Sequence, residues 1–205
     1  MKQPFGIILA GGQATRMGGG DKSRHDLDGR SILSHVIDRI EPQVARLAIN
    51  ANGDEARFAD TGLPVVADSI DGFAGPLAGV LAGLDWAAEY GADHVVSVAA
   101  DTPFFPADLV PQLMLASELK NHPISLAASP DPQKGMMRHP TFGLWPVALR
   151  DDLRNALQDG LRKVVLWTDK HGTALAEFPA PRFDPFFNVN TPEDLDKARA
   201  LMETT

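Results

Sequence analysis

The sequence contains no cysteine. This absence excludes disulfide bonds, thiolate zinc sites and cysteine nucleophiles, and it is typical of a reducing compartment, so we expect a cytoplasmic protein. Long apolar runs are also missing, because no run approaches the roughly 18 residues that a membrane-spanning helix needs. Residues 1–4 lack the charged segment and long apolar stretch of a signal peptide. We therefore expect no membrane partner.

Positive charge is scarce, since 19 Lys and Arg stand against 27 Asp and Glu and the net charge is −8. This balance argues against a broad nucleic-acid surface, so we expect no nucleic-acid partner. A protein this acidic that binds a polyphosphate must gather its cations locally or use a metal ion. The chain has 205 residues, 44% of them hydrophobic, which is enough for a sizeable core. We expect one domain over 1–205 and a monomer.

Short apolar runs alternate with amphipathic stretches along the chain. The runs predict strands at 5–9, 46–51, 64–67, 94–100, 124–128, 141–145, 173–178 and 186–189. Helices are predicted at 32–40, 55–60, from 76, from 106, at 147–157, from 161 to 172 and from 192. Ser31 can cap the helix at 32–40, and Thr191 with an acid at Asp194 gives the last helix a capped start. The stretch 129–138 is predicted to be a polar loop. This order indicates an α/β fold, Rossmann-like, with a mostly parallel central sheet and helices on both faces.

A glycine-rich stretch follows the first predicted strand, with the sequence LAGGQATRMGGGDK over 9–22. Five glycines fall within ten residues, which lets the backbone bend tightly and approach a ligand. Two cations, Arg16 and Lys22, flank the glycines. Exposed backbone N–H groups and fixed positive charge form a phosphate cradle. The stretch is neither a P-loop, since Asp21 precedes Lys22, nor a dinucleotide fingerprint, since Gly11 and Gly12 are adjacent.

Polar residues follow the predicted strands repeatedly. They are Gly11 and Gly12, Asn50, Asp68 and Asp101. In an open α/β sheet, ligands bind at the carboxyl ends of the strands, so we expect these residues to converge on one crevice. Asp101 ends the most clearly buried strand and is well placed to hold Mg²⁺, which prefers one or two carboxylates together with phosphate oxygens and water.

Two asparagines, Asn188 and Asn190, precede the last predicted helix. We expect one of them to supply a second oxygen to the metal and the other to satisfy backbone groups. Which of the two approaches the metal stays open.

The glycine-rich stretch resembles the signature loop of nucleotidyltransferases, and most closely that of the molybdenum cofactor guanylyltransferases. The resemblance extends over nearly the whole chain, in the order and at the spacing of that family. Its further segments are NAN at 50–52, DS at 68–69, GPLAG at 75–79, ADTP at 100–103, RHPT at 138–141 and NVNTPED at 188–194.

This resemblance implies substrates, a cofactor and site residues. It implies GTP binding by Leu9, Ala10, Gly11, Gly12, Lys22, Asn50 and Asp68, Mg²⁺ at Asp101, and transfer of GMP to molybdenum-bound molybdopterin with release of pyrophosphate. Arg16, Lys22 and Asp101 are then the expected catalytic residues, and Arg138 and His139 are expected to contact the pterin. Molybdenum-insertion proteins and molybdoenzyme chaperones are the implied protein partners.

Three alternatives remain open at this point. One is the cytidylyl counterpart of the same family, which usually carries Leu-Ala-Ala-Gly where this chain has Gly11, and the missing methyl group favours guanine. Another is a sugar-phosphate nucleotidyltransferase, although such enzymes usually lack the Asn-Ala-Asn and His-Pro-Thr segments. The third is a non-enzymatic adaptor that carries molybdopterin, which would not need Asp101 together with Lys22.

Overall fold

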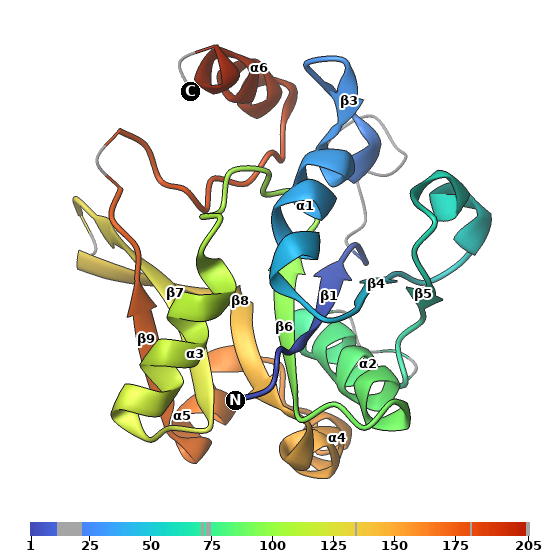
Figure 1. The fold of residues 1–205 in the computed structure, drawn as a ribbon, viewed down its shortest axis with the longest axis vertical. Coiled ribbons are helices and arrows are strands. Elements are labelled where there is room, and N and C mark those ends of the chain that lie inside the picture. Colours follow the sequence, from blue (N-terminus) through green and yellow to red (C-terminus); the bar gives the residue numbers. More distant parts are fainter. Residues whose placement is uncertain (12–21, 71, 73–74, 134, 181, 204–205) are drawn as a thin grey trace.

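A seven-stranded sheet forms the centre of the computed structural model, which describes all residues except 12–21, 71, 73–74, 134, 181 and 204–205 (Figure 1). Its strand order is β5-β4-β1-β6-β8-β7-β9. The strands are β1 (Phe5–Leu9), β4 (Leu47–Asn50), β5 (Val65–Val66), β6 (His94–Ala99), β7 (Ile124–Asp131), β8 (Gly135–Pro146) and β9 (Thr173–Glu177). β8 is antiparallel to both of its neighbours, and the other pairs are parallel. The mostly parallel α/β fold is thereby confirmed.

Helices cover both faces of this sheet, and the last helix of the chain lies apart from it (Figure 1). They are α1 (Ile32–Ile40), α2 (Pro76–Glu89), α3 (Leu109–Lys120), α4 (Arg150–Gln158), α5 (Val164–His171) and α6 (Pro192–Met202). Short 3-10 turns lie at Lys22–Arg24, Glu41–Gln43, Glu55–Thr61 and Val147–Leu149, and a two-stranded ribbon pairs β2 (Asp26–Leu27) with β3 (Arg30–Ser31). Within the described part of the chain, no helix combines the length and apolar character that crossing a bilayer requires.

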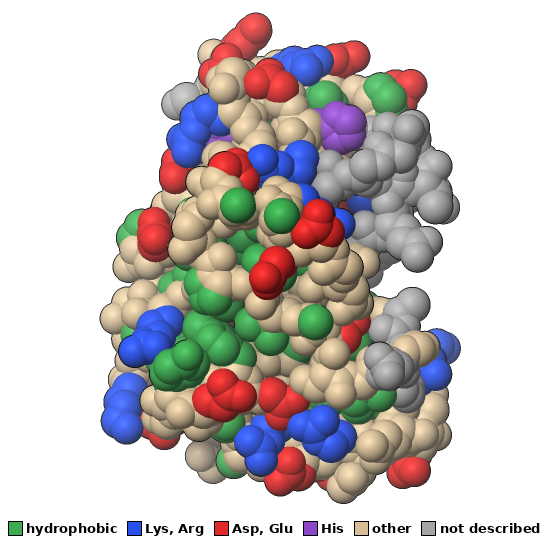
Figure 2. Space-filling view, turned by 90° about the vertical axis from the view of Figure 1, so that its right-hand side faces the viewer, with side chains coloured by type: hydrophobic (Ala, Val, Ile, Leu, Met, Phe, Trp, Pro, Cys, Tyr) green, Lys and Arg blue, Asp and Glu red, His purple; other side chains and the backbone are tan. Residues whose placement is uncertain are grey.

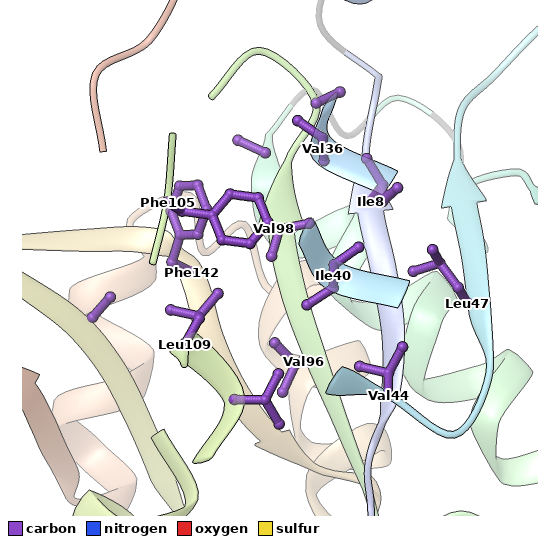
Figure 3. Close-up of a cluster of buried hydrophobic side chains, with 14 of the residues drawn as sticks. Ile8, Val36, Ile40, Val44, Leu47, Val96, Val98, Phe105, Leu109 and Phe142 are labelled. Atoms are coloured by element: carbon purple, nitrogen blue, oxygen red, sulfur yellow. The ribbon is translucent and has the colours of Figure 1, made fainter. Parts of the chain in front are cut away.

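Two hydrophobic clusters hold helices α1 to α5 to the sheet, and a third joins α6 to β2 and the start of α1. Because side chains alternate along a strand, Ile8 of β1 points to the face under α1 and α3, and Ile7 to the face under α2, α4 and α5. Figure 3 shows the first cluster, in which Val36 and Ile40 of α1 lie over the sheet. Full burial of each such side chain contributes about 1.5–3 kcal/mol relative to exposure. The predicted cap is confirmed, since the Ser31 hydroxyl accepts a hydrogen bond from the Ser34 N–H.

Helix α2 approaches the sheet closely because glycines face the strands. A Cβ atom on Gly83 would lie 3.0 Å from Cγ2 of Ile7, and a Cβ on Gly79 would overlap the side chains of Leu9 and Asn50. Only a residue without a side chain fits at Gly79. This contact sets the first turns of α2 against the carboxyl ends of β1 and β4.

The predicted polar loop at 129–138 is wrong, because most of this stretch extends β7 and β8 into a long hairpin. Ser129 pairs with Met137 and Asp131 with Gly135, which has a positive φ of 76° near the turn. The prolines and the glycine suggested a break in structure. Pairing between the two strands nevertheless continues past Pro130, so the local signals marked only the turn.

Two further expectations need correction. Helix α3 begins at Leu109 rather than at Pro106. Residues 186–189 form no strand; the side chains of Phe186 and Val189 are buried in different clusters, and the Val189 N–H donates a 2.8 Å hydrogen bond to the Asp101 carbonyl. This segment is therefore held beside the end of β6 by side-chain burial, by the backbone bond from Val189 to Asp101 and by the contact between Thr102 and Asn188, and not by strand pairing.

The surface carries charges of both signs. On the face shown in Figure 2, Lys and Arg side chains are interspersed with Asp and Glu, and hydrophobic side chains gather between them in the middle. Mixed charge of this kind is the usual distribution on a solvated surface.

Candidate active site

The carboxyl ends of four neighbouring strands meet at one edge of the sheet. Leu9, the last residue of β1, pairs with Asn50 of β4 on one side and with Ala99 of β6 on the other. After β1 the chain forms β4 and β5 on one side of β1, and it then crosses over to form β6 on the other side. The order of the strands therefore changes direction at β1. Such a switch point is where open α/β sheets bind ligands. Asn50, the last residue of β4, and Asp101, two positions beyond β6, both lie at this edge.

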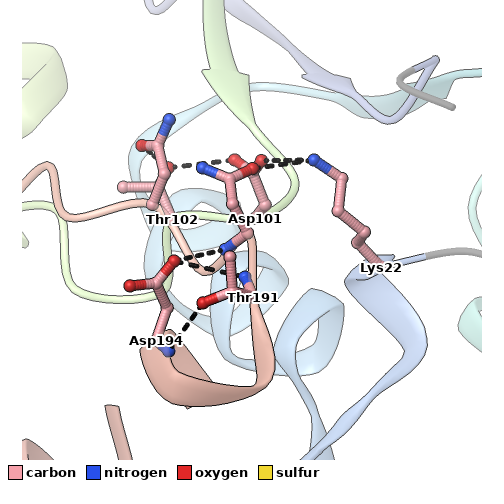
Figure 4. Close-up of polar contacts among 7 residues, drawn as sticks. Lys22, Asp101, Thr102, Thr191 and Asp194 are labelled. Atoms are coloured by element: carbon pink, nitrogen blue, oxygen red, sulfur yellow. Dashed lines mark hydrogen bonds and ion pairs between the residues drawn. The ribbon is translucent and has the colours of Figure 1, made fainter. Parts of the chain in front are cut away.

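Asp101 lies at this edge beside Lys22, which comes from a distant part of the chain (Figure 4). The Lys22 Nζ is 3.5 Å from Oδ2 of Asp101 and donates a 2.8 Å hydrogen bond to Oδ1 of Asn190. The side chains of Lys22 and Asp101 are 21% and 20% exposed. A partly desolvated cation and carboxylate interact more strongly than they would in bulk water. The cluster thus joins fixed positive charge to two oxygen donors.

Thr102 lies on the other side of the Asp101 carboxylate. Its side chain is fully buried, and its Oγ1 is 3.2 Å from Oδ1 of Asp101 and 2.8 Å from Oδ1 of Asn188. Asn188 itself is exposed. Both asparagines therefore belong to one cluster around Asp101, with Asn190 on the Lys22 side and Asn188 on the Thr102 side.

The start of α6 fixes the position of Asn190. The predicted capping box is confirmed: the Thr191 hydroxyl accepts from the Asp194 N–H at 3.2 Å, and the Asp194 carboxylate accepts from the Thr191 N–H at 3.2 Å. The same Oδ2 of Asp194 also accepts from the Asn190 N–H at 3.2 Å. The backbone that carries Asn190 is thereby tied to the helix terminus, as Figure 4 shows for Thr191 and Asp194.

A second polar group lies at the ends of β4 and β5. The amide of Asn50 donates to Oδ1 of Asp68 at 2.9 Å and to the Val66 carbonyl at 3.1 Å. Asn52 donates to Oδ2 of Asp68 at 2.8 Å and accepts from the Asp68 N–H at 2.9 Å. Asn50 is only 3% exposed. Asp68 is thus oriented by two amides, and neither of its oxygens reaches the Asp101 cluster through a described hydrogen bond.

The predicted site residues at the start of the glycine-rich stretch differ in their exposure to solvent. Ala10 is buried, Leu9 is half-buried against Gly79, and Gly11 is exposed. A Cβ on Gly11 would meet only Oδ1 of Asn50, at 3.8 Å, within the described residues. The predicted site residues Gly12 and Arg16 lie outside the described residues.

Arg138 and His139 are not brought together, because neighbouring residues of a strand point to opposite faces. Arg138 pairs with Asp169 of α5 at 2.7 Å. His139 stacks on Phe186, with ring centroids 4.2 Å apart, and its Nε2 is 2.7 Å from Oγ of Ser129. Burial lowers the pKa of His139, and nearby Asp184 opposes this effect only in part. The two side chains therefore lie in different environments.

The sequence interpretation assigned no role to Thr102 or Asn52, although both contact predicted site residues. Asn52 follows Asn50 by two positions, a spacing that allows both side chains to reach Asp68. For Thr102 the only local signal is its place after Asp101, because its burial depends on the packing of distant segments.

The donors around Asp101 fit a magnesium ion. Among the described residues, no group of three or more His, Cys, Asp or Glu side chains is placed to hold a metal. One carboxylate with nearby amide oxygens is instead the kind of set that Mg²⁺ accepts when phosphate oxygens and water supply the other ligands.

Comparison with known proteins reveals extensive similarity. Residues 6–173 match the family described as MobA-like NTP transferase domain. The chain is 52% identical over 199 residues to a molybdenum cofactor guanylyltransferase of Bradyrhizobium sp. (strain ORS 278), and the match covers 96% of this chain and 92% of that protein.

Solved structures share the fold at lower identity. A molybdopterin-guanine dinucleotide biosynthesis protein A from Archaeoglobus fulgidus is 21% identical, with a TM-score of 0.74 over 98% of this chain and 100% of that chain. A CMP:2-keto-3-deoxy-manno-octonic acid synthetase complexed with CTP is 16% identical, with a TM-score of 0.73 over 99% of each chain.

Proposed function

This chain belongs to the MobA-like NTP transferase family and is a nucleotidyltransferase, and we propose that it transfers GMP from GTP to molybdenum-bound molybdopterin. The products are molybdopterin guanine dinucleotide cofactor and pyrophosphate. One observation carries the proposal: Lys22, Asp101 and Asn190 meet beside the end of β1, where the glycine-rich sequence begins. A carrier of molybdopterin would need no such combination of cation and carboxylate at a polyphosphate site.

The proposed reaction is attack by a terminal phosphate oxygen of molybdopterin on the α-phosphorus of GTP. The new oxygen–phosphorus bond forms as the bond from the α-phosphorus to the bridging oxygen of pyrophosphate breaks. Because the attacking oxygen is already anionic, no strong general base is needed. Alignment of the two substrates and cationic stabilisation of the leaving group then supply most of the catalysis. Lys22 and Arg16 are the proposed cations.

Magnesium is the proposed cofactor. Asp101 would hold the ion. Of the two asparagines, Asn190 would lie nearer to it, because Asn190 and Asp101 both contact the Lys22 ammonium. When bound, the ion neutralises phosphate charge and helps the pyrophosphate depart. The chain's own part is to keep a carboxylate and an amide oxygen facing the phosphates.

The nucleotide is proposed to occupy the edge from Leu9 to Asp68. Leu9, Ala10, Gly11 and Gly12 would line the base, and the buried Asn50 with the doubly hydrogen-bonded Asp68 would supply fixed polar groups beside it. Arg138 and His139 are the proposed pterin contacts, although they face different sides of β8.

A cytidylyltransferase is the alternative that the fold leaves open, because a protein with a related fold was solved with CTP. The absence of a side chain at Gly11 and the 52% identical guanylyltransferase favour guanine. We further propose a monomer that acts in the cytoplasm, where GTP is formed, and that exchanges its pterin with molybdenum-insertion proteins and molybdoenzyme chaperones.

Pyrophosphate release with three nucleotides tests the proposal. The protein is incubated with Mg²⁺ and molybdenum-loaded molybdopterin, together with GTP, CTP or ATP. We expect release with GTP that depends on the pterin. Equal use of GTP and CTP would refute the guanine assignment, and no release with any of the three would refute the transferase assignment.

A further inference from the structure

The Asp101 carboxylate has two unlike sides. Its Oδ2 faces the Lys22 ammonium at 3.5 Å, on the side where Asn190 also lies. Its Oδ1 faces the Thr102 hydroxyl at 3.2 Å. Because Thr102 is fully buried, its hydroxyl is held in place by packing rather than by solvent.

One hydroxyl hydrogen cannot be given fully to two acceptors. Thr102 Oγ1 lies within reach of Oδ1 of Asp101 and Oδ1 of Asn188. The contact with the Asn188 amide oxygen is 2.8 Å and the contact with the Asp101 carboxylate is 3.2 Å, so the hydroxyl hydrogen is shared between the two oxygens. The Asn188 oxygen thereby holds the Thr102 hydroxyl beside Oδ1 of Asp101. Asn188, Thr102 and Asp101 form one polar chain.

We propose that Thr102 is a positioning residue that holds Oδ1 of Asp101 and thereby presents Oδ2 to the metal ion. In this arrangement Asn188 supports Thr102 and is not a metal ligand. Asn190, on the Oδ2 side, is the asparagine near the ion. The proposal rests on the proposed magnesium site. It assigns different roles to Asn188 and Asn190, which the sequence could not tell apart.

Backbone contacts support this division. The Val189 N–H donates to the Asp101 carbonyl at 2.8 Å, so the segment carrying both asparagines is bound directly to the Asp101–Thr102 turn. The Val189 side chain is fully buried, which fixes the residue between them. Asn188 and Asn190 therefore keep their separate places on either side of the carboxylate.

Binding of Mn²⁺ to the nucleotide-free protein, followed by electron paramagnetic resonance, tests the proposal without catalysis. Thr102→Val keeps the shape of the side chain and removes the hydroxyl, and we expect it to weaken Mn²⁺ binding about 10- to 100-fold, as loss of an outer-shell partner does. Thr102→Ser restores the hydroxyl and should bind within about threefold of the parent protein.

Ser125→Ala is the matched control. It removes another fully buried hydroxyl, which donates to the Leu113 carbonyl at 2.7 Å near the start of β7, away from the carboxyl ends. It should lower the melting temperature and leave Mn²⁺ affinity unchanged. A purely structural role for Thr102 predicts the same behaviour for Thr102→Val, and that result would overturn the proposal.

Asn188→Ala keeps the test decisive if Thr102→Val does not fold, since Asn188 is exposed. We expect Asn188→Ala alone to weaken Mn²⁺ binding. Combined with Thr102→Val, it should cause no further loss of affinity, because Asn188 acts only through Thr102. Parent-like Mn²⁺ affinity of Asn188→Ala would overturn the proposal. If Asp101→Asn binds Mn²⁺ as well as the parent does, the metal site itself is wrong; if only the Thr102 variants match the parent, the positioning role alone fails.

Discussion

Lys22 and Asn190 lie 168 positions apart in the sequence, and the Lys22 Nζ donates a 2.8 Å hydrogen bond to Oδ1 of Asn190. This bond ties the end of the glycine-rich sequence to the segment before α6. Together with Asp101, it places one cation at the carboxyl edge of the sheet, where a triphosphate would need it.

Lys22→Ala should reduce GMP transfer by on the order of 10²-fold or more, as the loss of a positioned charge donor does. Its melting temperature should fall by only a few degrees, because the change removes one 2.8 Å hydrogen bond to Asn190 and one 3.5 Å ion pair and leaves the buried core untouched. Arg24→Ala is the control, since Arg24 pairs instead with Asp60 at 2.7 Å, and it should keep normal turnover. Full activity of Lys22→Ala, or a large drop in its melting temperature, would exclude this role.

Gly11→Ala should fold normally and use GTP less well relative to CTP. Its Cβ would have ordinary contact with Asn50 at 3.8 Å, so the described residues leave room for it and we expect only the base to be crowded. Gly79→Ala is the contrasting variant, because its Cβ would overlap Asn50 and Leu9 and so disturb the site itself. The measurements are the ratio of GTP to CTP turnover and the melting temperature of each variant. An unchanged ratio in Gly11→Ala would show that this residue does not select the base.

Arg138→Gln should raise the KM for molybdopterin roughly 10-fold, the effect of losing one charged hydrogen bond, and leave the KM for GTP unchanged. Asp169→Asn removes the partner of Arg138 but keeps the cation, so both KM values should stay near those of the parent protein. If Arg138→Gln raises both KM values equally, Arg138 supports the fold and not the acceptor.

Asp152→Asn should lower the melting temperature at pH 7 by about 1–4 °C, and the difference from the parent should shrink as the pH falls below about 4. The Trp167 N–H, and then His171 and Lys170, lower the pKa of Asp152 through hydrogen bonds. A depressed carboxyl pKa stabilises the fold above the unfolded value and loses that effect as the carboxylate is protonated. Melting curves from pH 7 to pH 3 provide the check, and a constant difference would show that the charge is not involved.

Local signals in the sequence predicted the elements that depend on neighbouring residues. The apolar run of β1, the Ser31 cap of α1 and the Thr191–Asp194 cap of α6 are of this kind. The place of Asn50 and Asp101 at the carboxyl edge of the sheet also followed, because parallel strands share that edge.

Features that depend on distant partners could not be predicted in the same way. Prolines suggested a loop at 129–138, where pairing between β7 and β8 extends the strands. This error also hid the fact that Arg138 and His139 lie on a strand and point to opposite faces. The burial of Thr102 and the support of Asn190 by Asp194 arise from packing between the end of β6 and the start of α6.

The central claim is that Asp101 serves GMP transfer through a bound magnesium ion. The most direct test is the yield of molybdopterin guanine dinucleotide from GTP as Mg²⁺ is varied, in Asp101→Asn with Asp68→Asn as the comparison. Asp101→Asn keeps the size of the side chain and should fold normally, yet transfer GMP at a rate near background. Asp68→Asn should weaken GTP binding and keep the parent's response to Mg²⁺. Near-normal transfer by Asp101→Asn at millimolar Mg²⁺, or the collapse of its fold, would contradict the claim.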